Sequence, residues 1–176
     1  MPKSYVILTP GASAVVSLVK PQPVRTGLLR NVQMMSYNGK QVYASELTKF
    51  APYAIGQRVA AKEKWGEVYE IVEGKRIHVA YIYDSDKGNE QYSEYHFDDY
   101  RSPVTMPLSA VRRWLVVESV ECLRVKDVTN FVELGVSGND REEMFTNFPA
   151  TIIKKHGPAA WDDNAYIFLT TFKDEQ

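Results

Sequence analysis

Residues 102–136 decide the fold, and they read SPVTMPLSAVRRWLVVESVECLRVKDVTNFVELGV. The part from 112 to 126 is rich in Val and Leu and has no Gly or Pro, which predicts one long β-strand. Glu118 and Ser119 interrupt its apolar rows, and this favours a bent strand that serves two parts of a barrel. Alternation predicts two faces, one with Trp114, Val116, Val120 and Cys122 and the other with Leu115, Val117, Leu123 and Val125.

A short helix is predicted next, over residues 127–136. Asn130 followed by Glu133 fits a capping box, and Thr129 is an alternative cap. Gly135 suits the end of this helix, because a left-handed backbone costs glycine least. The helix would have barely two turns, so tertiary packing must hold it in place.

On the N-terminal side the pattern predicts mostly strands. Residues 5–8 and 14–19 are short apolar stretches, and residues 58–65 alternate cleanly. A hairpin is predicted from residues 68–72 and 77–83, around the turn Glu73-Gly74-Lys75. Residues 24–52 are mixed and polar around an Asn38-Gly39 turn, so they predict an irregular insertion with little regular structure.

On the C-terminal side the pattern predicts a helix and a last strand. Asp140 is a suitable cap for a helix over residues 140–148, and Pro149 lies beyond its predicted end. A basic patch follows at residues 154–156, and residues 166–172 predict the closing strand.

The composition predicts one folded domain over residues 1–176. Apolar residues make up 44% of the chain, which is enough to build a core. No run approaches the roughly 20 apolar residues of a membrane span, so no membrane partner is expected. The N-terminus lacks a signal-peptide pattern, and the single cysteine, Cys122, suits a buried, inert thiol. These features predict a reducing cytoplasm, which would be that of the bacterial host if a phage encodes the chain.

Charge is spread unevenly along the chain. Residues 1–64 hold nine Lys and Arg against two Glu, a net charge of +7, while residues 65–176 carry a net charge of −8. Such asymmetry favours a basic face for phosphates. The alternative is that folding interleaves the two halves and cancels the field.

An acidic, tyrosine-rich segment covers residues 84–101. It is interpreted as a solvated loop or hairpin extension with aromatic rings tucked against the body. A metal site is the alternative, but the run from Asp84 to Gly88 lacks the later ligands of a calcium loop. The candidate ligands for that alternative are Asp84, Asp86, His96, Asp98 and Asp99.

Several short motifs, in a fixed order, carry a family resemblance. They are VKPQP at 19–23, YAIGQRVAAKEKW at 53–65, MPLSAVR at 106–112, KDVT from Lys126, ELGV at 133–136 and WDDNAYIF at 161–168. In this order the chain resembles a divergent phage-type ASCH domain protein of the PUA-like superfamily. The resemblance implies an α+β, mainly β fold, with a small antiparallel β-barrel and short flanking helices.

The resemblance also implies activities. Relatives in the superfamily bind RNA or modified bases in a cleft beside the barrel. One branch resembles an amidohydrolase that deacetylates acetylcytidine with a Lys and a Thr near the N-terminus and a Glu near the helix after the long strand. Here the Lys-Thr positions fall on residues 12–17, which contain no lysine, and the acid position falls on Gly135, two residues from Glu133. We therefore assign no catalytic residue, and no metal or cofactor.

The predicted binding residues combine cations with one aromatic ring. Trp65 would stack a base, its basic neighbours would hold phosphate, and Glu63 would accept a hydrogen bond from a base amino group. Arg112 would bind phosphate bidentately. The alternatives are that Trp65 is a core residue, that Glu63 is a surface carboxylate and that Arg112 forms a structural ion pair. The candidate site comprises Lys20, Arg25, Lys62, Glu63, Lys64, Trp65 and Arg112.

Three functions follow as hypotheses. The first is a phage-type protein that binds RNA or a nucleotide in a basic, aromatic-lined cleft. The second is an acetylcytidine-type amidohydrolase, which would need a catalytic residue outside the usual positions. The third is an interaction or counter-defence protein that binds a host protein or a signalling nucleotide, suggested by the acidic segment at 84–101. The sequence carries no signal for an oligomeric state.

Overall fold

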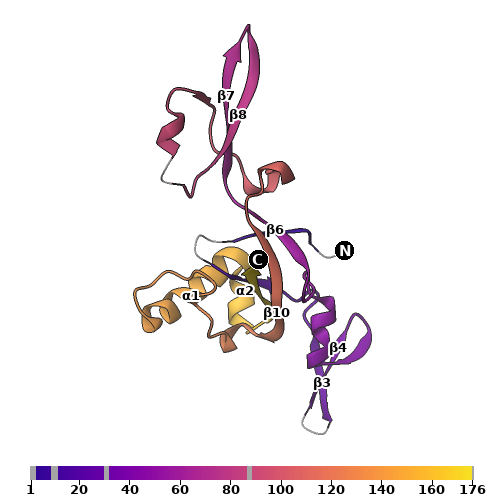
Figure 1. Ribbon diagram of the computed structural model, residues 1–176. Helices are drawn as coiled ribbons and strands as arrows, with labels where there is room; N and C mark the ends of the chain where they lie inside the picture. The colour runs from indigo at the N-terminus through magenta and orange to yellow at the C-terminus, as the bar shows by residue number, and fades with distance from the viewer. Residues whose placement is uncertain (1–2, 9–11, 30–31, 87–88, 176) are drawn as a thin grey trace.

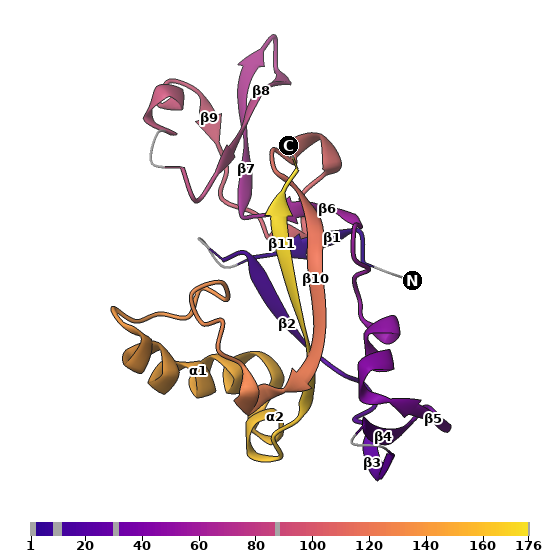
Figure 2. The same ribbon diagram turned by 60° about the horizontal axis from the view of Figure 1, so that its bottom comes forward.

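A five-stranded sheet organises the computed structural model, which describes residues 3–8, 12–29, 32–86 and 89–175. The strand order is β1-β6-β10-β11-β2 (Figures 1 and 2). β1 runs parallel to β6, and the other pairs are antiparallel. The strands are β1 (Tyr5–Ile7), β2 (Ala14–Leu18), β6 (Arg58–Lys62), β10 (Trp114–Arg124) and β11 (Tyr166–Asp174).

β10 confirms the predicted long strand and contains the predicted irregularity. Its register against β11 shifts between Val117 and Ser119, which is a β-bulge. The extra residue moves the alternation by one, so Val120 and Cys122 join Leu115 and Val117 on the same core face. The two faces expected from simple alternation are therefore wrong beyond Glu118.

The sheet is open, which corrects the expected closed barrel. β1 and β2 lie at its two edges, and the described residues show no pairing between them. A barrel requires hydrogen bonds across every neighbouring pair of strands. The coarser expectation holds, because the fold is mainly β with flanking helices.

Helices cover one face of the sheet. α1 (Arg141–His156) and α2 (Pro158–Asp162) pack Phe148, Ile152 and Ala160 against Ile167 and Leu169 of β11. The Asp140 cap is confirmed, since its carboxylate accepts from the Glu143 N–H at 2.9 Å. The helix does not stop before Pro149 but continues through it, because the following turn buries Ile152 in this core.

The helix expected at 127–136 is replaced by turns. A 3-10 turn, η5 (Val125–Asp127), follows β10, and hydrogen-bonded turns then run to Val136. Gly135 does adopt the expected left-handed conformation, with φ of 64°. Asn130 bonds the Glu133 side chain instead of capping a helix, so the segment is held by packing of Phe131 and Val136.

The other face is covered by the segment that was expected to be irregular. Residues 24–52 form β3 (Val24–Leu29), β4 (Val32–Tyr37), β5 (Lys40–Tyr43) and the 3-10 helix η1 (Ala44–Phe50). Asn38 and Gly39 make the predicted turn, with φ of 50° and 72°. Met35 and Leu47 are fully buried against the sheet, and this burial orders the segment despite its polar composition.

A hairpin arm projects from the body (Figures 1 and 2). β7 (Trp65–Val72) pairs with β8 (Lys75–Tyr83) around a turn at Glu73 and Gly74, as predicted, and with β9 (His96–Phe97) on its other side. The predicted strand at 58–65 is interrupted, because β6 ends at Lys62 and the arm begins at Trp65. The remaining 3-10 turns are η2 (Asn89–Tyr92), η3 (Pro103–Thr105) and η4 (Leu108–Ala110).

Candidate anion-binding site

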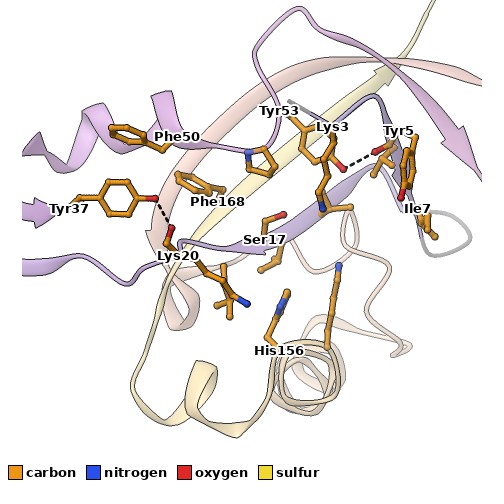
Figure 3. A pocket seen from close by; sticks show the side chains of 16 residues that line it. Lys3, Tyr5, Ile7, Ser17, Lys20, Tyr37, Phe50, Tyr53, His156 and Phe168 are labelled. Atoms are coloured by element: carbon orange, nitrogen blue, oxygen red, sulfur yellow. Dashed lines mark hydrogen bonds between the residues drawn. The ribbon is translucent and has the colours of Figure 1, made fainter. Parts of the chain in front are cut away.

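A hollow of about 500 Å³ lies where the two edges of the open sheet approach each other (Figure 3). Both edge strands line it, together with the end of η1, the last turn of α1 and one residue of β11. The cavity lies between these two unpaired edge strands, and we call it the edge cavity. Its lining residues are Lys3, Tyr5, Val6, Ile7, Val15, Val16, Ser17, Leu18, Lys20, Tyr37, Phe50, Pro52, Tyr53, Lys155, His156 and Phe168.

Four basic side chains meet in the edge cavity from three separate parts of the chain. Lys3 precedes β1, Lys20 follows β2, and Lys155 and His156 end α1. No Asp or Glu is among the described residues that line the cavity. The described ion pairs likewise include none of the four basic residues.

These four groups are close enough to influence one another. Partial burial and the neighbouring charge of Lys3 lower the pKa of Lys155. Burial, followed by the charges of Lys155 and Lys20, lowers the pKa of His156. Figure 3 shows Lys20 and His156 pointing toward one another. The cavity therefore brings three exposed lysines together around a partly buried histidine.

His156 has an unused polar atom. Its Nε2 is buried and has no hydrogen-bond partner among the described residues. The backbone of Val16 in β2 favours the protonated ring and works against the other influences on its pKa. An orphaned buried ring nitrogen costs stability unless something binds it.

Aromatic rings form the other wall of the edge cavity. Phe50 is 43% exposed and Tyr5 is partly exposed, so these two rings present faces to a ligand. Tyr37 and Tyr53 are buried, and their hydroxyls donate to the carbonyls of Lys20 at 2.9 Å and of Tyr5 at 3.1 Å. These bonds fix the backbone that carries Lys20 and Tyr5. Burial raises the pKa of Tyr53 to about 12, which keeps it a neutral donor.

The sequence-predicted residues fall in three places. Lys20 lines the edge cavity, and Arg25 is exposed on β3 outside it. The residues Lys62, Glu63, Lys64 and Arg112 line a second hollow of about 750 Å³, which shares Ile7 with the first. Trp65 lines neither hollow.

The second hollow is electrically compensated. Arg112 contacts Glu63 at 2.9 Å and Asp86 at 2.6 Å, and these bonds raise its pKa. Lys64 pairs with Asp84 at 3.6 Å. The Lys62 ammonium donates to the carbonyl of Met106 at 2.7 Å and lies 4.7 Å from the centre of the Tyr5 ring. The cations here already have partners, as the ion-pair alternative required.

Trp65 belongs to the core at the base of the arm. It is 4% exposed and packs with Tyr83, Met106 and Ala110. Its Nε1 is buried without a partner in the described structure. The ring has no free face for a base, so the core-tryptophan alternative describes it.

Three of the six carboxylates in the acidic segment form described ion pairs with nearby cations. Asp98 accepts from Tyr69 at 2.7 Å and from Arg76 at 2.6 Å, and both bonds lower its pKa. Asp84 and Asp86 pair with Lys64 and Arg112 as described above. Across residues 3–8, 12–29, 32–86 and 89–175, no three His, Cys, Asp or Glu side chains gather as metal ligands would. These pairs reduce the acidic surface available for imitating nucleic acid, while Glu90, Glu94 and Asp99 are exposed and belong to none of the described ion pairs.

Sequence reasoning missed most of the edge cavity. Lys155 and His156 were visible only as a basic patch, and Lys3, Tyr5 and Phe50 carried no signal. Their proximity arises from the approach of the two sheet edges, which no local pattern encodes.

Comparison with known proteins gives no relative, since no family model, curated protein or solved structure matches this chain. Within the described residues, no helix is long and apolar enough to cross a bilayer. The site must be interpreted from its own chemistry.

Proposed function

We propose that this protein binds a nucleotide in the edge cavity. The observation that carries the proposal is the cluster of Lys3, Lys20, Lys155 and His156 with no lining carboxylate. The three lysines are exposed at the cavity, and like charges gathered at one place repel one another until an anion compensates them. A phosphate group supplies that compensation and accepts hydrogen bonds from all four side chains.

The remaining lining suits the rest of a nucleotide. A volume of about 500 Å³ is within the range of small-molecule sites, about 300–1,000 Å³. The exposed ring of Phe50 and the partly exposed ring of Tyr5 offer stacking surfaces to a base. The resemblance to ASCH domain proteins supports the same class of ligand.

A single nucleotide fits better than a long RNA. RNA binding requires a basic track that follows the phosphate backbone. Here several surface arginines are paired with carboxylates, as in Arg58–Glu175 and Arg113–Asp174. In the edge cavity, four basic groups instead surround one small hollow that no described carboxylate lines.

Isothermal titration of the full chain with AMP, GMP, CMP and UMP tests the proposal. We expect binding that weakens as salt rises, and a loss of about tenfold in Lys20→Gln, which removes one charge-assisted contact. Lys75→Gln is the matched control, because Lys75 lies at the turn of the arm. If no mononucleotide binds, or if Lys75→Gln weakens binding as much, the proposal fails. Tighter binding of a single-stranded RNA 12-mer would favour RNA instead.

The amidohydrolase is a second candidate, supported by one observation. Lys20 and Ser17 line the same cavity as His156, so amine, hydroxyl and imidazole groups surround one space. This chemistry requires a general base positioned beside an attacking water. Incubation with acetylcytidine, followed by chromatography for cytidine, tests this activity. Product that disappears in Lys20→Gln supports it, and no product at a molar excess of protein excludes it.

A further inference from the structure

The orphaned Nε2 of His156 distinguishes the edge cavity from an ordinary basic patch. It is buried, it has no partner among the described residues, and it lies among three lysines. The last turn of α1 carries partial negative charge, which attracts cations and does not attract an anion. Affinity for an anion must therefore come from the side chains themselves.

We propose that His156 takes up a proton when a nucleotide binds, and that the edge cavity thereby selects the dianionic phosphate of a nucleoside monophosphate over a phosphodiester. This inference rests on the proposed function and deepens it. The proton comes from solvent and is carried on Nε2, which then donates to a phosphate oxygen. No covalent bond is made or broken.

Before binding, the surroundings oppose a charge on the ring. Lys155 faces it from the same helix, Lys20 from the end of β2, and Lys3 adds to the field through Lys155. The other titratable groups that line the cavity are Tyr5, Tyr37 and Tyr53. Among the described residues, the backbone of Val16 is the one influence that favours protonation of the ring. Because these influences together lower its pKa, the ring is neutral at pH 7.5 in the free protein.

A bound phosphate reverses this balance. A monoester carries about −1.5 to −2 charges at neutral pH, whereas a diester carries one. The greater charge offsets Lys20 and Lys155 more completely, so it favours the imidazolium more strongly. Proton uptake and preference for a monoester are two results of one electrostatic cause, and they should appear together.

Calorimetry of the full chain at pH 7.5 in HEPES and in Tris measures the uptake. These buffers differ in ionisation enthalpy, so the difference in binding enthalpy counts the protons exchanged. For the tightest of the four nucleoside monophosphates, we expect uptake of about 0.3–1 proton per ligand. The matching nucleoside should bind with no uptake, and the 3′,5′-cyclic monophosphate at least about tenfold more weakly than the monophosphate.

His156→Gln should keep weaker binding and lose the uptake, whereas His78→Gln should change neither. His78 is exposed on the arm beside Glu67 and is the matched control. The NMR signal of the His156 ring in the unmodified protein gives a second measurement, because it should move to the protonated position on adding the monophosphate. This measurement holds even if His156→Gln does not fold.

Three results would overturn the inference. Binding of the monophosphate without proton uptake contradicts the inference but leaves the proposed function intact. Equal proton uptake in His156→Gln assigns the proton to another group, such as Lys155, and this result also contradicts the inference. Failure of every mononucleotide to bind removes both the inference and the proposed function.

Discussion

At the scale of single residues, Arg112 shows why an arginine alone does not identify a phosphate site. Its guanidinium binds Glu63 and Asp86 and lies 4.0 Å from the centre of the Tyr83 ring. Carboxylates and phosphates offer the same pair of acceptors to the guanidinium. The sequence establishes that Arg112 follows a proline-marked loop, but the fold decides which anion it meets.

Arg112→Lys should lower stability without lowering nucleotide affinity. A lysine cannot reproduce the bidentate contacts with Glu63 and Asp86, and partly exposed ion pairs of this kind are worth about 1 kcal/mol together. Urea unfolding measures the change in stability, and titration with the tightest mononucleotide measures affinity. A tenfold loss of affinity would instead place the ligand in the second hollow.

Cys122 should react slowly with thiol reagents. Burial raises its pKa to about 11, so the thiolate fraction at pH 8 is far below that of a free cysteine. We expect labelling by Ellman's reagent at least about tenfold slower than that of glutathione, and acceleration in urea. Labelling of the folded protein at the rate of glutathione would show that the strand around the bulge opens readily.

At the scale of elements, the β-bulge in β10 explains one limit of the sequence pattern. Glu118 and Ser119 signalled an irregularity, but a polar pair does not say whether a residue is inserted. The structure inserts one, and the Ser119 hydroxyl then bonds that of Thr171 across the pair at 2.7 Å. Residues 24–52 show a second limit, because a few buried residues, Met35, Tyr37 and Leu47, order a segment of mixed composition in which only the Asn38-Gly39 turn was readable.

Pro149→Ala should stabilise α1. Pro149 lies inside the helix and cannot donate to the carbonyl four residues earlier, a loss that an alanine restores. We expect a gain of about 1–2 kcal/mol in urea unfolding, less than the full cost of an internal proline because the helix already accommodates it. The Asp140→Ala variant is the opposing control, and it should lose about 1 kcal/mol by removing the cap. A Pro149→Ala variant that is less stable would show that the proline is needed for packing.

At the scale of the whole molecule, the edge cavity depends on the unclosed sheet. Lys3, Lys20 and the end of α1 are far apart in the sequence and meet because β1 and β2 do not pair. Of these, Lys20 alone was predicted, and it was predicted from its place beside the prolines. The excess positive charge of the N-terminal part is partly cancelled by pairs such as Arg58–Glu175, while the cavity keeps its own charge.

The cationic surroundings of His156 should make the stability of the protein depend on pH and on phosphate. The pKa of His156 is lower in the folded chain than its ordinary value of about 6.5, which the unfolded chain retains. Stability is therefore full above about pH 6.5 and falls as pH drops toward the folded value, because the unfolded chain binds the proton first. Phosphate, bound only by the folded chain, favours the imidazolium and should reduce this loss.

Thermal melts from pH 8 to 5.5, in chloride and in phosphate at equal ionic strength, measure this effect. Between pH 7.5 and 5.5 in chloride, we expect Tm to fall by roughly 1–3 °C more in the unmodified protein than in His156→Gln. In phosphate the difference between the two proteins should shrink, since the anion compensates the charge that the ring gains. His78→Gln should behave like the unmodified protein. Parallel pH profiles for the unmodified protein and His156→Gln would show that His156 does not cause the pH dependence of stability. They would also show that the fold tolerates the cationic cluster without a ligand.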